Sequence, residues 1–296
     1  MSSHKLFNKL ALGTAQFGFA YGISNQSGKV SREEVLKILT HGEEFGLDTL
    51  HTAIGYGESE KVLGEIGSTR WDTISKISAI PNDCHDIETW INDSVKGSLQ
   101  RLQTQKLSGI LLSRTEQLLN ENGTSIYNAL VGLKDANLVD KIGISIYDPY
   151  ELDLICPNYY FDIVQAPLNI FDRRLVNSGW LKRLAEQEIE VHARSIFLQG
   201  LLLMSPDSRP SKFKRWDSLW NSWREWLKQL ELTPLEACLA YALNQLEINR
   251  VLVGVESLVQ FKEILQAVSC KLVDIPEELQ CDDAELINPT LWKSLC

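Results

Sequence analysis

The stretch KIGISIYDPYELDLICPNYYFDIVQAPL, residues 141–168, contains two short β-prone runs separated by a segment of helical character. The first run is KIGISI at 141–146, and the second is DIVQAPL at 162–168. The segment between them begins near Asp148 and is long enough for a crossover helix. This alternation predicts two parallel strands joined by a helix.

The same alternation continues from this unit towards both ends of the chain. Eight β-prone runs occur in all, at residues 10–15, 49–53, 73–77, 109–113, 141–146, 162–168, 190–196 and 250–255. Helices are expected to begin near Glu58, Asp86, Thr124, Asp148, Leu175, Pro234 and Leu258, and after a capping box formed by Ser31 and Glu34. Eight such units predict the α/β class and a single (β/α)8 TIM barrel. Because no low-complexity linker interrupts them, residues 1–296 are interpreted as one domain.

An insertion at about residues 201–231 lengthens the seventh strand-to-helix connection and is rich in tryptophan. Trp216, Trp220 and Trp223 are spaced to share one face of a helix. Since aromatic stripes usually belong to a core, we expect this one to pack the extra helix onto the barrel. The alternative is a partial lid at the catalytic end, whose aromatic wall would stack a sugar or another flat substrate.

The net charge of −10 argues against nucleic acid or an anionic membrane as the main partner, because such partners require a basic surface. The short basic stretch of Lys212, Lys214 and Arg215 is interpreted as a solvated helix edge. Nothing in the sequence predicts the oligomeric state.

The six cysteines, at 84, 156, 238, 270, 281 and 296, form no C-x-x-C pair and have no histidine at metal-ligand spacing. We therefore expect reduced thiols and no metal site. No apolar run has the length of a signal peptide or a transmembrane helix, so a cytoplasmic location is expected.

Polar residues follow nearly every predicted strand at its carboxyl end, where barrels of this kind assemble their active sites. In chain order they are Gly13, Thr14 and Gln16; His51, Thr52 and Tyr56; Lys76; Ser113; Ser145; Gln165 and Asn169; Arg194 and Ser195; and Gly254, Glu256 and Ser257. Their convergence predicts a functional site at this end of the barrel.

Six segments make the sequence resemble the aldo-keto reductases. They are LGTAQFG at 12–18, HTAIGYGESEKVLG at 51–64, SKI at 75–77, GISIYDP at 143–149, QAPLNIFDRR at 165–174 and RSIFLQG at 194–200. The resemblance implies a barrel that binds a nicotinamide cofactor without a Rossmann motif and transfers hydride to or from a carbonyl. The absence of G-x-G-x-x-G from the sequence fits this expectation.

The resemblance also implies a catalytic role for Tyr56 as proton donor and for Lys76 as its helper. A phenol has an unperturbed pKa near ~10, and a nearby ammonium lowers that pKa, which makes Tyr56 a usable general acid. At the family's aspartate and histidine positions this chain has His51 and Ser113 instead.

These two replacements change what the catalytic group is expected to do. His51 should be neutral and should accept a hydrogen bond from Lys76 where they touch. Without a carboxylate partner, Lys76 should lose its proton more readily and become a candidate base. The hydroxyl of Ser113 can still bond a substrate oxygen, and its small size leaves space for a bulkier substrate or a water.

For the cofactor, the resemblance implies that Gln165 and Ser145 hold the nicotinamide amide, and that Gly13 and Thr14 approach the ribose and pyrophosphate. The further cofactor-binding candidates are Arg194, Ser195, Gln199, Gly200, Gly254, Glu256 and Ser257. The family's habit favours NADP(H), whereas the carboxylate of Glu256 suits the free 2′-hydroxyl of NAD(H). Both cofactors remain open at this point.

The leading functional hypothesis, from the resemblance, is therefore an oxidoreductase of aldo-keto reductase type that uses a nicotinamide cofactor. Its expected partner is a small-molecule carbonyl or alcohol, with sugar-like compounds among the candidates. A second hypothesis is a non-redox barrel enzyme that uses Lys76 and Tyr56 for proton transfer, as in elimination or epimerisation. A third is a catalytically silent protein that keeps cofactor binding for a regulatory task.

Overall fold

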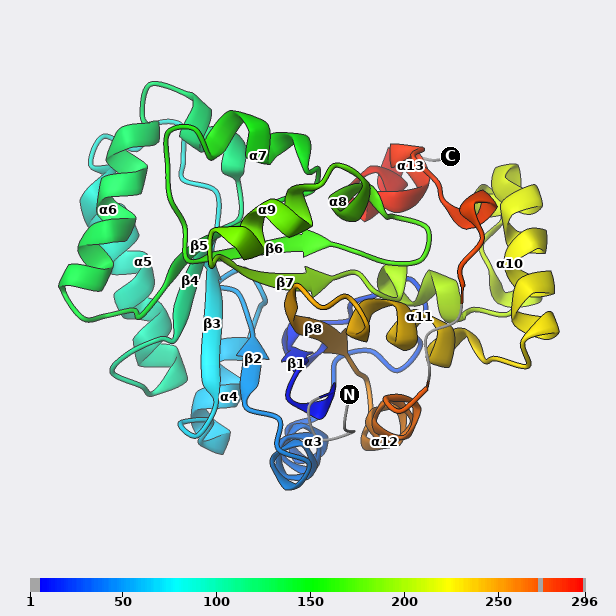
Figure 1. Cartoon of the computed structure of the whole chain (residues 1–296). Coiled ribbons are helices and arrows are strands. Elements are labelled where there is room, and N and C mark those ends of the chain that lie inside the picture. Colours follow the sequence, from blue (N-terminus) through cyan, green and yellow to red (C-terminus); the bar gives the residue numbers. More distant parts are fainter. Residues whose placement is uncertain (1–5, 271–273, 295–296) are drawn as a thin grey trace.

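The computed structural model describes residues 6–270 and 274–294. Eight parallel strands close into a barrel in sequence order, as Figure 1 shows. They are β1 (Leu10–Gly13), β2 (Thr49–His51), β3 (Asp72–Ile77), β4 (Gly109–Leu112), β5 (Ile142–Ser145), β6 (Ile163–Pro167), β7 (Glu190–Arg194) and β8 (Ile248–Gly254). Pairing of Leu10 with Val251 begins the β1–β8 ladder that closes the barrel. The predicted (β/α)8 TIM barrel is thereby confirmed.

The helices surround the barrel (Figure 1). They are α2 (Ala15–Gly18), α3 (Arg32–Glu44), α4 (Ser59–Ile66), α5 (Ile87–Leu102), α6 (Gly123–Asp135), α7 (Tyr150–Ile155), α8 (Arg174–Asn177), α9 (Trp180–Glu186), α10 (Asp217–Gln229), α11 (Pro234–Leu243), α12 (Leu258–Ala267) and α13 (Ala284–Ile287). Short 3₁₀ segments are η1 (Thr115–Leu119), η2 (Leu198–Leu203), η3 (Pro206–Ser208), η4 (Ser211–Trp216), η5 (Glu277–Leu279) and η6 (Pro289–Ser294).

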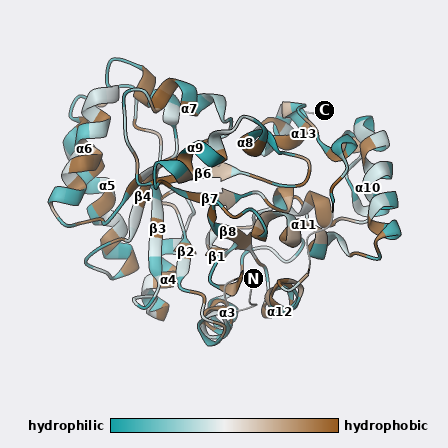
Figure 2. Cartoon of the chain, viewed as in Figure 1, coloured by the Kyte–Doolittle hydropathy of each residue, from teal (hydrophilic) through white to brown (hydrophobic). Residues whose placement is uncertain are grey.

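The inside of the barrel changes from apolar to polar along the strands. Ile74, Leu111 and Ile163 form a small buried cluster of their own, from β3, β4 and β6. Because side chains on one face of a strand recur every second residue, Lys76, Ser113 and Gln165 follow on the same face, one step closer to the carboxyl ends. The apolar cluster therefore supports a polar layer. The larger core lies between the barrel and its helices. Figure 2 shows hydrophobic residues, in brown, along both the strands and the helices.

The predicted capping box at the start of α3 is only half formed. The Ser31 hydroxyl accepts a hydrogen bond from the Glu34 N–H at 3.2 Å, as expected. The Glu34 carboxylate, however, accepts from the Leu258 N–H at 2.7 Å instead of reaching back to Ser31. A helix N-terminus has unpaired N–H groups that attract a carboxylate, and α12 lies close enough to provide them. The interpretation of Glu34 as a local cap was therefore wrong.

The tryptophan-rich insertion folds into η2, η3, η4 and α10, and Figure 1 shows α10 at the edge of the molecule. Trp220 and Trp223 of α10 are buried, and their ring centroids lie 5.1 and 5.8 Å from that of Phe171. Trp216 belongs to η4 and donates its indole N–H to Asp283. Trp220 and Trp223 therefore pack the insertion onto the β6–α8 connection, as the first interpretation expected, whereas Trp216 lies outside α10 and contacts Asp283 instead.

Among the residues described, no helix combines the length and apolar character needed to cross a membrane. Cys84, Cys156, Cys238, Cys270 and Cys281 form no disulfide. Cys296 lies outside the described residues.

Candidate active site

Tyr56 is held at the mouth of the barrel by a tight contact between its loop and α2. A Cβ atom on Gly18 would lie 1.7 Å from the Tyr56 carbonyl oxygen, so only glycine permits this approach. The loop then turns through Gly57, whose φ of +53° lies in the left-handed region. The Tyr56 carbonyl accepts from the Ser59 N–H at 3.0 Å, at the start of α4. The position of Tyr56 therefore depends on two glycines.

We expect Gly18→Ala to lower the free energy of unfolding by about 2–3 kcal/mol, because the new methyl group must push away backbone atoms. Gly132→Ala is a matched control, since Gly132 is also a helical glycine but a Cβ there would meet no described atom within 4 Å. The control should gain up to about 1 kcal/mol from helix propensity. Urea unfolding of both variants measures the difference, and equal stabilities would show that the Tyr56 loop tolerates displacement.

Lys76 approaches Tyr56 but has no carboxylate partner among the residues described. Its Nζ lies 5.0 Å from the centroid of the Tyr56 ring, and its side chain is buried. Burial, together with the positive charge of Arg194, lowers the pKa of Lys76 to about 7. The pKa of Tyr56 is raised by burial and lowered to a smaller extent by Arg194. The sequence predicts that the Lys76 ammonium lowers the pKa of this phenol, but Arg194 is the cation that acts on it here.

His51 faces across the barrel rather than towards Lys76. Its Nε2 lies 2.8 Å from His192 Nδ1, and its Nδ1 lies 3.0 Å from Gln165 Nε2. Both ring nitrogens are therefore occupied, and the expected hydrogen bond from Lys76 does not form. Burial is the main cause that holds the pKa of His51 well below its usual range, with His192 and Lys76 adding to it. His51 is accordingly neutral, as expected.

These contacts extend into a buried polar column through the barrel. The Ser145 hydroxyl donates to Gln165 Oε1 at 2.9 Å, so the Gln165 amide donates to His51 Nδ1. His51 then carries its proton on Nε2 and donates to His192. The column, Ser145–Gln165–His51–His192, joins four different strands.

The column ends near the opposite face of the barrel. His192 Nε2 lies 3.4 Å from Glu190 Oε2 but has no hydrogen-bond partner in the described part of the chain. His192 and Lys141 beside it hold the pKa of the Glu190 carboxyl at about 2. Sequence reasoning missed His192. The alternation along β7 could have found it, because His192 shares the inward face of Arg194 two residues later.

Replacing His51 by leucine should cost about 2–3 kcal/mol of unfolding free energy, because it leaves an amide donor on Gln165 and an acceptor on His192 unpaired inside the barrel. Urea unfolding at pH 7.5 checks this value. His85→Leu is the control, since His85 is exposed and should change stability by less than about 0.5 kcal/mol. A stable His51→Leu protein would mean that the column contributes nothing to folding.

Ser113 and Gln165 differ in the hydrogen-bonding capacity that they still offer. The Ser113 hydroxyl donates to the Ile77 carbonyl at 2.6 Å, which ties the ends of β3 and β4 together. Ser113 therefore offers a substrate only its oxygen lone pairs. Gln165 uses one amide hydrogen and one lone pair inside the column, so one donor and one acceptor position remain.

Arg194 is the main positive charge of the site. Its guanidinium stacks on Tyr147 at 4.4 Å, donates to the Ile146 carbonyl at 2.8 Å and donates to Ser195 Oγ at 3.0 Å. These contacts fix the charge close enough to Lys76 and Tyr56 to affect both pKa values. Tyr147 was not among the predicted site residues, although it lies within the resembling segment GISIYDP.

The connection after β7 has an unusual backbone. Ser195, Leu198 and Gln199 all have φ between +49° and +60°, a region that non-glycine residues seldom adopt. Gly200 has φ of +88°, and a Cβ there would lie 1.9 Å from Ser24 Oγ. Gln199 also donates from Nε2 to the Tyr21 hydroxyl at 3.2 Å. Such strain is concentrated at ligand-binding segments, so this backbone suits the cofactor roles that the sequence predicts for Gln199 and Gly200.

The remaining predicted residues lie around β1 and β8. Thr14 is completely buried, and its hydroxyl donates to the His51 carbonyl at 3.2 Å and accepts from Ser59 at 2.8 Å. Thr14 therefore ties β1 to β2 and α4, while Gly13 beside it is partly exposed. Thr14 itself is not accessible to a cofactor in this structure.

At β8, Gly254 is exposed and is followed by the start of α12. Ser257 caps α12 by accepting from the Gln260 N–H at 3.2 Å, and the Glu256 N–H donates to Gln260 Oε1 at 2.9 Å. Burial raises the pKa of Glu256. Since Glu34 also reaches this helix terminus, two carboxylates lie at the start of α12, where Lys37 approaches the second oxygen of Glu34 only at 3.8 Å.

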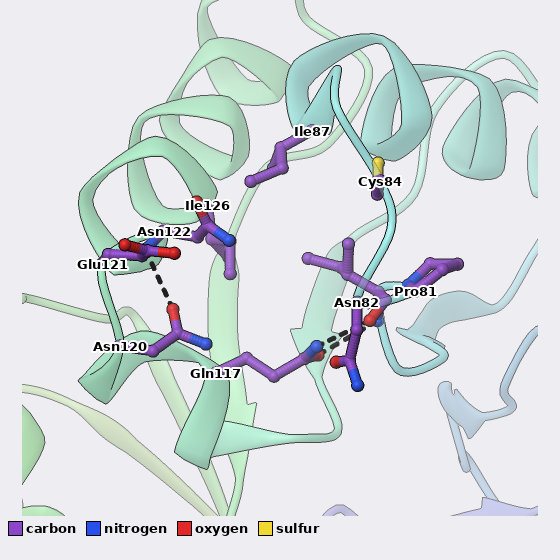
Figure 3. A pocket seen from close by; sticks show the side chains of 10 residues that line it. Pro81, Asn82, Cys84, Ile87, Gln117, Asn120, Glu121, Asn122 and Ile126 are labelled. Atoms are coloured by element: carbon purple, nitrogen blue, oxygen red, sulfur yellow. Dashed lines mark hydrogen bonds between the residues drawn. The ribbon is translucent and has the colours of Figure 1, made fainter.

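A cavity of about 390 Å³ lies between the connections that follow β3 and β4 (Figure 3). Its lining is rich in amides, including Asn82, Asn120 and Asn122. The Gln117 side chain bridges the two connections, accepting from the Ile80 N–H at 3.0 Å and donating to the Ile80 carbonyl at 2.7 Å. Glu121 is the only charged residue among the described residues of the lining, which suits a neutral polar molecule.

Comparisons with known proteins agree with this architecture. The model of the Aldo/keto reductase family matches residues 9–278. The chain is 26% identical over 285 residues to a Bacillus subtilis protein described as uncharacterized oxidoreductase YqkF, covering 89% of this chain and 92% of that protein.

Two solved structures share the fold. The first is aldo-keto reductase AKR11C1 from Bacillus halodurans in its holo form, with a TM-score of 0.71 and 21% identity over 92% of this chain and 89% of that one. The second is the glycerol dehydrogenase AKR11B4 from Gluconobacter oxydans, with a TM-score of 0.68 and 18% identity over 91% of this chain and 88% of that one. Because the family model matches most of its length, the chain belongs to the aldo/keto reductase family.

Proposed function

We propose that the protein is a nicotinamide-dependent oxidoreductase that interconverts a carbonyl and an alcohol on a small polar substrate. Family membership supports the oxidoreductase class. The observation that carries the proposal is the Tyr56 and Lys76 pair at the carboxyl end of the closed barrel, with Nζ 5.0 Å from the phenol ring.

The residues present fit the nicotinamide half of such a cofactor. Gln165 retains one amide donor and one acceptor position, which match the two hydrogen-bonding groups of a carboxamide. Only 1% of its surface is exposed, so a carboxamide reaches these groups only after neighbouring side chains move. Ser145 holds Gln165 in orientation. When bound, the nicotinamide supplies or accepts the hydride.

The chain's own residues would handle the proton. Tyr56 donates a proton to the carbonyl oxygen in reduction and takes it back in oxidation. Lys76, with a pKa of about 7, exists in both protonation states near neutral pH and can exchange a proton with its surroundings. Arg194 stabilises the developing phenolate through its positive charge. His51 and Ser113 would support the site through its framework, since their donor groups are already used within the protein.

For the substrate, we propose a small polyol or sugar-like compound. None of the candidate site residues lines the amide-rich cavity between the β3 and β4 connections, so the substrate class rests on the relatives. The relative from Gluconobacter oxydans, described as a glycerol dehydrogenase, supports the same substrate class.

A second candidate function follows from the absence of a carboxylate partner for Lys76 among the residues described. An amine with a pKa of about 7 in a buried site is a competent general base, so proton abstraction without hydride transfer is the alternative. Turnover that continues without any added nicotinamide cofactor would favour it.

We expect NADH to bind at least about tenfold more tightly than NADPH, because two carboxylates lie where the resemblance puts the adenosine end: that of Glu34 accepts from the Leu258 N–H, and that of Glu256 accepts from the Gln26 N–H. Fluorescence titration with each cofactor measures this difference. Glu34→Gln should reduce the ratio of the NADPH and NADH dissociation constants. Glu33→Gln, at an exposed neighbouring position, should leave that ratio unchanged. Tighter binding of NADPH contradicts the preference, and failure of both cofactors to bind contradicts the proposed function.

A further inference from the structure

The insertion forms a second cavity of about 530 Å³, which is partly open to solvent and is lined by residues from Leu203 to Pro234. Its lining comes from the end of η2, from η3 and η4, and from α10. None of the candidate active-site residues takes part. A cavity of this volume is in the range that binds small molecules.

One wall of this cavity is apolar. Its lining includes Met204, Pro206, Pro210 and Leu227. Trp220 and Trp223 also belong to the lining but are only 4% and 3% exposed, because Arg209 lies over the Trp220 ring and Trp226 stacks on Trp223. The proline rings lose little conformational entropy when an apolar group packs against them.

The polar part of the cavity is positively charged. Arg209, Lys214 and Arg224 line it, whereas Asp217 is the one acidic side chain among the described residues of the lining. The whole chain has a net charge of −10, so the positive charge of this cavity is opposite in sign to that of the protein. The basic stretch at 212–215, interpreted from the sequence as a solvated helix edge, is divided in the structure: Lys214 faces the cavity, while Arg215 pairs with Asp283 at 3.0 Å and with Glu285.

The half-buried guanidinium of Arg209 has few hydrogen-bond acceptors around it. Its guanidinium carbon lies 3.8 Å from the centroid of the Trp220 ring. Its Nη2 donates to the Met204 carbonyl at a long 3.4 Å, and its Nε is shielded from solvent without an acceptor among the residues described. A guanidinium in this setting gains more from an anion than a fully solvated one does, because the surroundings screen the charge less.

We propose that this cavity is a second ligand site, which binds a carboxylate that carries an apolar ring. The ring would pack against the apolar wall beside Pro206 and Pro210, and the carboxylate would face Arg209 and Lys214. Both parts of the ligand are required, since the wall selects an apolar group and the cations select a negative charge.

Isothermal titration of the full-length protein with 2-naphthoate tests the proposal, with 2-naphthalenemethanol as the neutral analogue of the same shape. We expect 2-naphthoate to bind with a Kd below about 1 mM and the alcohol to bind about tenfold more weakly. Equal affinities would overturn the assignment of an anion, and no heat from either probe at about 10 mM would overturn the site itself.

Substitutions of the basic residues test whether 2-naphthoate binds in this cavity. Arg209→Gln should lower the affinity for 2-naphthoate about tenfold. Arg215→Gln, whose side chain lies outside the lining, should leave that affinity unchanged.

A second measurement is needed because Arg209→Gln also alters the packing of Trp220. The double variant Lys214→Gln, Arg224→Gln changes two exposed side chains and should show the same tenfold loss of affinity. Unchanged affinity in both variants would place the probe elsewhere and overturn the proposal. No cofactor or turnover enters these measurements, so their failure is distinct from failure of the proposed function.

Discussion

Tyr56→Phe is expected to lower kcat about 10³-fold while leaving cofactor affinity within about twofold of the original protein. Removal of the phenolic hydroxyl removes the proton donor, and positioned general acids contribute about 10² to 10⁴ in rate. The ring remains, so its contact with Phe19, at 6.1 Å between centroids, is kept. Since no hydrogen bond of this hydroxyl occurs among the residues described, the substitution should cost little stability.

The experiment measures two quantities for the original protein and for Tyr56→Phe. Initial rates on a panel of aldehydes, ketones and sugar derivatives give the turnover, and fluorescence titration gives the cofactor affinity. Tyr150→Phe is the matched control, because Tyr150 is a tyrosine with 62% of its surface exposed. Turnover by Tyr56→Phe at more than about a tenth of the original rate would remove Tyr56 from the proposed mechanism. Cofactor binding with no turnover by the unaltered protein on any member of the panel would favour a binding or regulatory task.

Lys76→Met is expected to stabilise the protein strongly at low pH and hardly at all near pH 10.5. The folded-state pKa of Lys76 falls from its ordinary value of 10.5 to about 7 because the side chain is buried. Below pH 7 both the folded and the unfolded chain bind this proton, and the folded chain bears the full cost of a buried charge. Between pH 7 and pH 10.5 the unfolded chain holds the proton and the folded chain does not, so stability rises with pH across this window.

At about 1.4 kcal/mol per pKa unit, the cost removed at pH 6 is roughly 3–5 kcal/mol. Urea unfolding of both proteins at pH 6 and pH 9.5 measures it, and Lys96→Met, at an exposed helical position, should show no such pH dependence. A Lys76→Met protein that is less stable than the original at pH 6 would mean that the ammonium is stabilised by a partner. Folding stability is the readout, so the result is independent of any effect on catalysis.

The location of the candidate site could be predicted because strand order and strand ends are local properties of the sequence. Each β-prone run has a clear carboxyl end, and a closed parallel barrel brings all these ends to one face. Tyr56 and Lys76 thus came together as expected, from the loop after β2 and from β3. The family membership of the chain agrees with the motifs that the sequence carries in order.

The partners of the inward side chains could not be predicted in the same way. His51 contacts Gln165 and His192, which are 114 and 141 residues away, and not Lys76. The stagger of the strands decides which side chains meet across the barrel. This stagger cannot be read from the spacing of residues in the sequence. The same reason explains Glu34, whose carboxylate reaches α12 over 224 residues rather than its own helix.

By itself, the sequence determined that this protein is a (β/α)8 barrel and which residues stand at its catalytic end, because periodicity and motif order are encoded within short segments. Only the tertiary structure decided that Lys76 is buried beside Tyr56 with a lowered pKa, that His51 completes a buried column, and that three cations of the insertion line one cavity. The physical reason is that pKa values, hydrogen-bond partners and cavities depend on burial and on contacts between distant segments. These exist only once the barrel has closed.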